Sequence, residues 1–482
     1  MTNLTIIWIA LPFFAGFVIY LLSKLDRWLA LGITLFSAGY AYQVFVAPAP
    51  IEIQLLDNFG VTLFIDQLSG FFILTNALVT AAVILYCWTT PKTSFFYMQA
   101  IILHGSVNAT FICADLISLY VALEVISIAA FLLIAYPRTD KSIWVGLRYL
   151  FVSNTAMLFY LVGAILVYQA HHSFNYAGLR GSPPEAIALI ILALLVKGGI
   201  FVSGLWLPLT HSESQSPVSA MLSGVVVKAG VFPLVRFALT LEELDPIVRF
   251  FGVSTALLGV GFAVLEKDTK RMLAFHTISQ LGFVLAAPVV GGFYALTHGL
   301  VKSALFLIAG ILPSRNFKQL QHQPISNQIW LVLLLASFSI SGFPLLSGFG
   351  AKVLTSKNFL PWQVVVMNIA ALGTAISFAK FIFLPHKKLD KEKEEKNIPP
   401  GFWWAMVILL GGLIAANGFY YEAYSLKNVV KPLITIGVGW VMFLLIFKRS
   451  LLKIPRVSEK FDNLIGVMSL MFILIFWMVL RV

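Results

Sequence analysis

Residues 187–209 read IALIILALLVKGGIFVSGLWLPL, a stretch whose single charged residue, Lys197, is followed directly by Gly198 and Gly199. A run of about 20 apolar residues is long enough for a helix to cross the roughly 30 Å hydrocarbon core of a bilayer. A charge at that depth costs on the order of 2.5–3.5 kcal/mol even on the lenient insertion scale, so it is a functional hypothesis by default. Paired glycines weaken a helix interior, which is tolerated there only where the backbone lines protein or a wet cavity. The stretch therefore predicts a broken membrane helix with a functional lysine beside the break.

The same apolar character fills the whole chain. Of its 482 residues, 59% are hydrophobic and 11% are charged, whereas charged residues make up about a quarter of a typical soluble domain. We therefore predict an all-α polytopic membrane protein, whose first span is a retained anchor because no small-residue cleavage site follows it. The apolar runs predict sixteen spanning segments, at residues 4–23, 28–47, 66–88, 95–113, 115–136, 143–169, 184–209, 217–240, 246–265, 272–290, 292–312, 326–356, 361–384, 401–420, 432–448 and 462–481.

The positions of the basic residues explain the net charge of +12 without a nucleic-acid partner. Basic residues gather in alternate loops, for example at Lys24 and Arg27, at 267–271 and in the charged loop at 385–400. By the positive-inside rule these loops face the cytoplasm, which puts both termini on the outer face. We expect a multi-pass protein of the bacterial inner membrane or of another energy-transducing membrane.

Two more spans in the first half carry an ionisable residue. The stretch LISLYVALEVISIAAFLLIA holds Glu124 as its only charge, and MLSGVVVKAGVFPLVRF carries Lys228 in its middle. An isolated carboxylate at this depth is either neutral or faced by a cation. Lys197 and Lys228 are the candidate cations. A purely structural ion pair that holds two helices together is the alternative for Glu124.

The second half repeats the broken helix. In LLLASFSISGFPLLSGFGAKVLTSK, the residues Gly342, Pro344 and Gly348 interrupt a span that is too long for one crossing, and Lys352 follows. Two interrupted helices at corresponding places in two halves indicate an inverted-repeat transporter, with ion sites at the breaks. A position of Lys352 near a helix end leaves a structural role open.

Further polar residues lie between the two breaks or at the ends of spans. His298 and Lys302 are four residues apart and therefore share a helical face. A polar stripe in the span at 272–290 adds hydrogen-bonding groups, although a core histidine is the plainer interpretation of its first member. His211 and Glu213 lie at a span junction, where they are candidates for gating proton entry, and Arg148 is expected to extend toward the membrane surface. The stripe consists of His276, Thr277, Ser279 and Gln280.

The sequence lacks the motifs of several reaction classes. It has no strand followed by G-x-G-x-x-G, no Walker loop, no nucleophile elbow and no metal-ligand spacing. We therefore predict no cofactor and no metal in this chain. The function that remains is movement of a small cation, for which the proton is the first candidate.

Three segments resemble the signature segments of the antiporter-like subunits shared by respiratory complex I, membrane-bound hydrogenases and Mrp-type cation/proton antiporters. They are GLWLPLTHSESQSPVSAMLSGVVVKAGVFPLVRF, EKDTKRMLAFHTISQLGFVL and HGLVKSALFLIAGIL. The resemblance implies about fourteen core transmembrane helices with two inverted five-helix repeats, each with a broken helix. The two predicted spans beyond residue 430 exceed this core and form a C-terminal helix pair whose role is open. The resemblance also implies the following division: N-terminal helices at 1–94, repeats at 95–240 and 246–384, a charged cytoplasmic loop at 385–400 and C-terminal helices at 401–482.

The resemblance also assigns roles. It implies that Glu124 and Lys197 form the family's key pair, that Lys228 is the central relay and that Lys352 is the exit residue. A lysine at position 352 and the run FHTISQLG are more similar to the D-type chain of Mrp antiporters than to the chain-four-like subunit of complex I, which usually has a glutamate there. Gly204 stands where relatives commonly have a histidine, which is a departure from the family pattern.

Two functions follow, with a purely structural subunit as a weaker third. The first is the proton-translocating subunit of a multisubunit Na⁺/H⁺ antiporter, with protons and a monovalent cation as substrates and other membrane subunits as partners. The second is a proton-pumping subunit of an NADH dehydrogenase or membrane hydrogenase, driven by electron transfer in partner chains. The chains that co-purify would distinguish the two.

Overall fold

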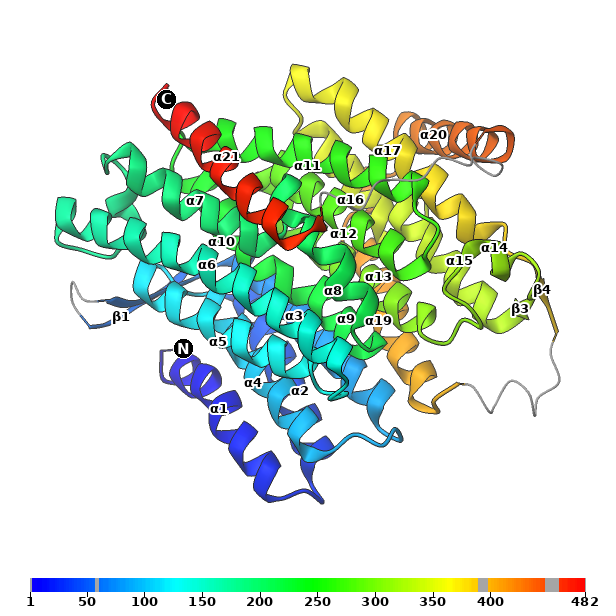
Figure 1. Cartoon of the computed structure of the whole chain (residues 1–482), viewed down its shortest axis with the longest axis horizontal. Helices are drawn as coiled ribbons and strands as arrows, with labels where there is room; N and C mark the ends of the chain where they lie inside the picture. Colours follow the sequence, from blue (N-terminus) through cyan, green and yellow to red (C-terminus); the bar gives the residue numbers. More distant parts are fainter. Residues whose placement is uncertain (1, 57–59, 389–397, 447–458, 482) are drawn as a thin grey trace.

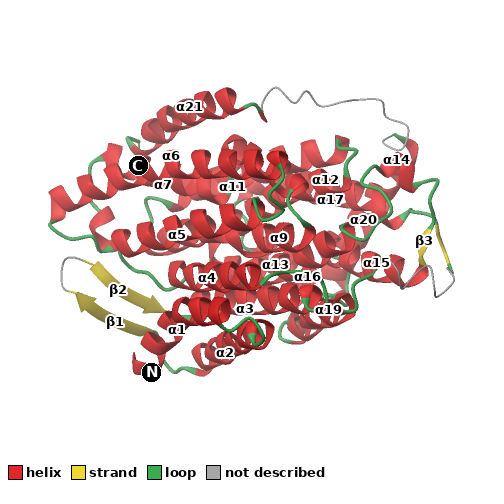
Figure 2. Ribbon diagram, turned by 60° about the horizontal axis from the view of Figure 1, so that its bottom comes forward, coloured by secondary structure: helices red, strands yellow, loops and turns green. Residues whose placement is uncertain are grey.

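The computed structural model of the chain describes residues 2–56, 60–388, 398–446 and 459–481. Its helices run side by side and form one bundle (Figure 1, Figure 2). Within these residues, thirteen helices are long and apolar enough to cross a membrane. The predicted all-α membrane fold is confirmed. Most of the charged loop predicted at 385–400 lies outside the described residues.

The first half of the bundle is built from α1 to α10, with a 3₁₀ turn (η2) and a π-turn (η3) inside two of its spans. A short antiparallel hairpin, β1 with β2, precedes α3. The elements are α1 (Thr2–Leu21), α2 (Asp26–Val46), β1 (Ile51–Leu56), β2 (Gly60–Ile65), α3 (Gln67–Cys87), α4 (Ser94–Thr110), α5 (Leu116–Ile134), α6 (Asp140–His171), η1 (Tyr176–Leu179), α7 (Pro184–Gly198), η2 (Phe201–Trp206), α8 (Leu207–Glu213), α9 (Ser216–Met221), η3 (Leu222–Val226) and α10 (Val227–Thr240).

The second half runs from α11 to α17, and three further helices follow it. Two very short strands, β3 and β4, pair in parallel. The elements are α11 (Asp245–Leu265), α12 (Thr269–Ala286), η4 (Pro288–Val290), α13 (Gly291–Ala309), α14 (Phe317–Leu320), β3 (Ile325–Ser326), α15 (Asn327–Ser341), α16 (Ser347–Lys357), α17 (Pro361–Ile382), β4 (His386–Lys387), α19 (Gly401–Gly418), η5 (Tyr421–Ala423), α20 (Leu426–Leu445) and α21 (Phe461–Val479).

All sixteen predicted spans coincide with helical segments. Three of the sixteen predicted spans are not among the thirteen long apolar helices, each for a different reason. The helix α4 has 17 residues, α12 carries Lys270 and Arg271 in its first turn, and the span predicted at 326–356 is divided into α15 and α16. The two ends of the chain lie at the same end of the bundle, as expected if both face the same side of the membrane (Figure 2).

Both broken helices end at a glycine in a left-handed conformation. The helix α7 ends at Gly199, whose φ is 67°, and α15 ends at Gly342, whose φ is 84°. A Cβ at Gly199 would lie 2.2 Å from Leu207 Cδ1, and one at Gly342 would lie 2.8 Å from Lys352 Cδ. Glycine adopts such a φ without the steric cost that a Cβ brings. Within each predicted repeat, at 95–240 and 246–384, the broken helix is the fourth of five spans.

The C-terminal helices α20 and α21 lie in different parts of the molecule. The helix α20 packs along α17, where Gly439 allows a close approach: a Cβ there would lie 2.6 Å from Ala375 Cβ. The helix α21 packs against α7 and η2 (Figure 1). The two helices expected beyond the fourteen-helix core are therefore present, but each packs mainly against the core.

The left-handed glycine at the first break gives a stability prediction. We expect Gly199→Ala to destabilise the protein by about 1–3 kcal/mol, because alanine would be strained at this φ and its methyl group would clash with Leu207. Thermal unfolding of the purified protein in detergent measures the change. Gly32→Ala is the matched control, since a Cβ at Gly32 meets nothing within 4 Å. Equal melting temperatures for the two variants would contradict the prediction.

Candidate functional site

Lys197 lies at the C-terminal end of α7, where three helices meet. Its side chain is buried, with 6% exposed, and Nζ donates hydrogen bonds to Ser127 Oγ of α5 and Ser153 Oγ of α6. The two hydroxyl oxygens are 3.0 Å apart. The C-terminus of a helix carries a partial negative charge that favours a cation. The end of the broken helix and two serines therefore stabilise the ammonium group together.

Glu124 lies on α5, three residues before Ser127 and on the same face of the helix. It interacts electrostatically with Lys197, but no ion pair within 4.0 Å joins the two side chains in the described part of the chain. Its Oε1 is buried and has no hydrogen-bond partner among the described residues. The structure thus brings the predicted pair close together and places serine hydroxyls, not the carboxylate, in direct contact with the lysine.

Sequence reasoning missed Ser127 and Ser153. The spacing of three residues from Glu124 would have identified Ser127 as a neighbour on the same helical face. Nothing in the sequence points to Ser153, because it reaches Lys197 only through the packing of α6 against α5 and α7.

Lys228 is fully buried in the bundle, next to the π-turn η3. Its Nζ donates to the backbone carbonyls of Ser223, at 3.3 Å, and Gly224. A π-turn interrupts the regular ladder of helical hydrogen bonds and is frequent at functional sites. On the other side, a Cβ at Gly299 of α13 would lie 3.5 Å from Lys228 Nζ and 2.3 Å from Thr75 Cγ2. Lys228 is therefore enclosed by α3 and α13 and does not extend to the surface.

The helices that carry Lys197 and Lys228 touch through glycines. A Cβ at Gly230 would lie 2.3 Å from the backbone nitrogen of Gly198. No side chain fits between the two backbones at this point. Within the described residues, no hydrogen bond joins the two ammonium groups, so any transfer between them involves water or a change of rotamer.

His298 and Lys302 lie on α13 between Lys228 and the second break. Both are buried. Lys302 Nζ donates to the carbonyl of Leu273 at 2.6 Å, and His298 lies within electrostatic range of both Lys228 and Lys302. Neither ring nitrogen of His298 has a hydrogen-bond partner among the residues that the structure describes. The predicted pair on one helical face therefore lies within a row of buried basic side chains that also includes Lys197, Lys228 and Lys352.

A small cavity joins His298 to Lys352. Its volume is about 10 Å³, which is room for roughly one water molecule, and Gln280 and Tyr294 also line it. The Tyr294 hydroxyl donates to Gln280 Oε1 at 2.7 Å. Lys352 Nζ is buried, lies 5.7 Å from the centre of the Phe283 ring and has no hydrogen-bond partner in the described ranges. The cavity therefore connects Lys352, beside the second break, to His298 of α13.

Three residues predicted from the sequence have other surroundings. Ser279 donates to the carbonyl of Ala256 at 2.9 Å and so joins α12 to α11. His276 packs against the ring of Phe378, with ring centroids 4.6 Å apart, and lies in electrostatic range of Lys302 and Lys352. Arg148 donates to the carbonyl of Glu459, just before α21. Ser279 and Arg148 therefore lie outside the row, whereas His276 borders it.

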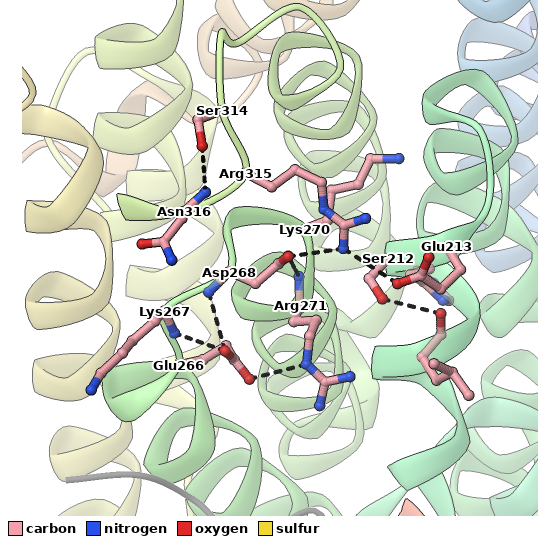
Figure 3. A network of polar contacts seen from close by, with 12 residues as sticks. Ser212, Glu213, Glu266, Lys267, Asp268, Lys270, Arg271, Ser314, Arg315 and Asn316 are labelled. Atoms are coloured by element: carbon pink, nitrogen blue, oxygen red, sulfur yellow. Dashed lines mark hydrogen bonds and ion pairs between the residues drawn. The ribbon is translucent and has the colours of Figure 1, made fainter. Parts of the chain in front are cut away.

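A cluster of charges covers the end of α8 (Figure 3). Glu213 forms ion pairs with Lys141, at 2.6 Å, and with Arg315, at 3.6 Å, and Arg315 also pairs with Asp268 at 2.9 Å. Two residues before Glu213, His211 is fully buried, and its ring nitrogens have no partner in the described residues. The charged cluster thus lies next to a buried imidazole.

Glu266 belongs to the same cluster and lies in the loop after α11. It accepts hydrogen bonds from the backbone N–H groups of Lys267 and Asp268, and it pairs with Arg271 at 3.1 Å. Burial acts to raise the pKa of Glu266, but these hydrogen bonds and the charge of Arg271 outweigh it and hold the pKa below its usual value. The carboxylate therefore stays ionised at neutral pH and fixes the start of α12.

The match to a known family is decided by residues 113–377, which fit the family model described as NADH:quinone oxidoreductase/Mrp antiporter, TM. The chain belongs to this family. The predicted resemblance is therefore confirmed. The match covers both broken helices, Glu124 and the buried basic residues from Lys197 to Lys352, whereas α1 to α4 and α19 to α21 lie outside it.

Relatives within the NADH:quinone oxidoreductase/Mrp antiporter family carry two kinds of name. The chain is 27% identical to the D-type chain of the Na(+)/H(+) antiporter of Alkalihalophilus pseudofirmus, over 90% of this chain and 99% of that protein. It is 28% identical to the N-type chain of the NADH-quinone oxidoreductase of Desulforudis audaxviator, over 80% of this chain and 81% of that protein. These relatives are subunits of multisubunit membrane assemblies.

Two solved structures share the fold. A chain of the Mrp complex from Dietzia superposes with a TM-score of 0.74 at 18% identity, over 97% of this chain and 100% of that chain. A chain of the membrane-bound sulfane sulfur reductase, an archaeal respiratory membrane complex, gives a TM-score of 0.74 at 22% identity, over 91% of this chain and 99% of that chain. The protein is a multi-pass integral membrane protein of this architecture.

The serines around Lys197 give a second prediction. We expect the double substitution Ser127→Ala and Ser153→Ala to destabilise the protein by about 1–3 kcal/mol, because it leaves a buried donor without an acceptor. The same pair of substitutions should cost much less in a Lys197→Met background, where no ammonium group needs them. Thermal unfolding of the four proteins measures the coupling. An equal cost in both backgrounds would contradict the assigned contact.

Proposed function

We propose that the chain is the proton-translocating, antiporter-like membrane subunit of a multisubunit monovalent cation/proton antiporter, with Na⁺ as the first candidate cation. The observation that carries this proposal is the row of buried basic side chains that runs between the two helix breaks. The likeness to the D-type chain of a Na(+)/H(+) antiporter over nearly its full length supports it. The row consists of Lys197, Lys228, His298, Lys302 and Lys352.

Glu124 sets the charge of Lys197 in the proposed mechanism. An ionised carboxylate nearby stabilises the ammonium form of the lysine. When Glu124 is neutralised or moves away, the buried ammonium loses that stabilisation, and release of its proton becomes favourable. The hydroxyl groups of Ser127 and Ser153 both accept and donate hydrogen bonds, so they can hold either form of the lysine and pass a proton on.

Lys228 and the α13 residues receive the proton next. Backbone carbonyls stabilise the ammonium of Lys228, and His298 lies in electrostatic range of it. The cavity between His298 and Lys352 has room for about one bridging water. In the proposed path, a proton passes from Lys197 to Lys228 by way of water or a change of rotamer and from His298 to Lys352 through this cavity.

The charged cluster at Glu213 is the proposed cytoplasmic entrance. Glu213 is held at the end of α8 by its ion pairs with Lys141 and Arg315, and His211 lies two residues away inside the bundle. Each elementary charge moved across the membrane involves about 2.3 kcal/mol per 100 mV. Net translocation is therefore coupled to a second ion or to a partner subunit, and the bacterial inner membrane is the proposed location.

The surroundings of Glu124 favour a partner subunit at the exposed surface of α5. Its side chain is half-buried, and Val121 and Ile128 on the same helix are exposed apolar residues. A neighbouring membrane subunit at this surface would cover the carboxylate and change its charge state. Other membrane subunits of the complex are therefore the proposed partners.

The alternative is a proton-pumping subunit of an NADH dehydrogenase or membrane hydrogenase. The likeness to the N-type chain of an NADH-quinone oxidoreductase supports it, and the same row of basic groups would serve either function. The two are distinguished by the chains that co-purify with the protein: small membrane subunits in one case, peripheral flavin and iron–sulfur subunits in the other.

A transport assay tests the proposal. In everted membrane vesicles that contain the assembled complex, we expect Lys197→Ala to lower ΔpH-driven Na⁺/H⁺ exchange by at least about tenfold, equivalent to about 1.4 kcal/mol, because the first carrier in the row is lost. Lys318→Ala is the control, since Lys318 is an exposed lysine on the short helix α14. Full exchange activity in a Lys197→Ala complex that assembles normally would overturn the proposal.

A further inference from the structure

A second cavity adjoins Lys352. Its volume is about 80 Å³, which is room for roughly five or more water molecules. Lys352 is the single residue common to this cavity and to the smaller one that contains His298. Lys352 therefore lies between two cavities: the one that contains His298, called the inner cavity, and the second one, called the outer cavity. Its amino group has no hydrogen-bond partner among the described residues that would fix it in one of the two cavities.

The helix α20 forms one wall of this outer cavity. Asn428, Lys431 and Thr435 all line it, and their spacing of three and four residues puts them on one face of the helix. The rest of α20 is largely apolar. A polar face on an apolar helix, turned toward a cavity, is the pattern expected for a helix that lines a wet passage.

The position of α20 is fixed relative to the second break. The chain between α19 and α20 contains Tyr424, whose hydroxyl accepts a hydrogen bond from the Leu345 N–H at 2.9 Å and donates one to Asn417 Oδ1 at 2.8 Å. Leu345 lies inside the break and has a φ of 78°. The ring of Tyr424 also packs against Phe349 of α16, with ring centroids 4.7 Å apart. The start of α20 is therefore attached to the half-helix that carries Lys352.

The charges at this cavity have one sign. Lys352 and Lys431 both line it, and none of its described lining residues is acidic. A charged ammonium group has three donors and no acceptor, so it offers no ligand to a metal cation, and fixed positive charges at a pore exclude cations. A fixed positive charge repels a hydrated proton as well, but the neutral form of a lysine amine can take up a proton and release it, which it cannot do with Na⁺ or K⁺.

We propose that this cavity is the outer mouth of the proton path and that Lys431 of α20 makes the mouth selective for protons over Na⁺ and K⁺. The inference rests on the proposed function, in which Lys352 is the last carrier. It assigns a role to a helix that lies outside the family match, and it implies that the exchanged metal cation crosses by another route.

Cysteine labelling tests the mouth without any transport measurement. The probes are a cationic and an anionic membrane-impermeant thiosulfonate of similar size, applied from the outer side to the intact complex. The reporter is Thr435→Cys in a background with Cys87→Ala and Cys113→Ala, which removes the two native buried thiols. We expect the anionic reagent to react at least tenfold faster than the cationic one, and Lys431→Gln to lower that ratio at least threefold.

The control is Lys427→Gln, which removes an exposed lysine one turn earlier on α20 that does not line the cavity. It should leave the ratio unchanged. Failure of Thr435→Cys to react from the outer side would overturn the assignment of the mouth. A ratio that Lys431→Gln leaves unchanged, or that Lys427→Gln lowers as much, would overturn the role of Lys431.

A transport measurement then separates this inference from the proposed function. In proteoliposomes that contain the complex, Lys431→Glu should lower the outer Na⁺ concentration that half-inhibits proton flux by at least threefold, because a carboxylate at the mouth can bind Na⁺. Lys427→Glu should not. A wild-type complex with no Na⁺-coupled flux would refute the proposed function, whereas the labelling ratios would still decide the charge selectivity of the mouth.

Discussion

A buried ammonium group must be given oxygen acceptors, and the rest of this structure follows from how the fold provides them. Lys197 is held by two serine hydroxyls at a helix end, Lys228 by carbonyls at a π-turn and Lys302 by the carbonyl of Leu273. Each acceptor is available because a helix is interrupted or because a neighbouring helix presents a polar group. Lys352 is the exception, since its amino group has no partner in the described residues and lies between two cavities.

The glycines at the breaks serve the same requirement. Gly199 and Gly342 adopt left-handed conformations that end α7 and α15 at the depth of the lysines. Gly198 and Gly230 let α7 and α10 touch backbone to backbone. The positions of the buried lysines are thus set by the packing of rigid helices and not by flexible loops. This packing keeps the proposed proton carriers at fixed separations.

Much of this arrangement could be predicted from the sequence. The lysines in apolar runs, the glycines beside them and the three signature segments indicate the spans, the breaks and the family. Ser127 could have been found from its spacing of three residues from Glu124. Ser153 and the π-turn could not be predicted, because each depends on packing between helices. Ser279 shows the limit of periodicity, since its place in a polar stripe did not reveal that it faces α11. The separate positions of α20 and α21 likewise depend on packing that an apolar pattern does not encode.

In the proposed relay, Lys228 gives up and regains a proton and does not merely supply a positive charge. The direct measurement is proton flux in proteoliposomes that contain the intact complex with Lys228→Arg, compared with Lys228→Met and with the wild type. Arginine keeps the charge but is not deprotonated in proteins. We expect both variants to lose proton flux by at least about tenfold, equivalent to about 1.4 kcal/mol. Wild-type flux in the Lys228→Arg complex would show that a fixed charge is sufficient and would contradict the relay.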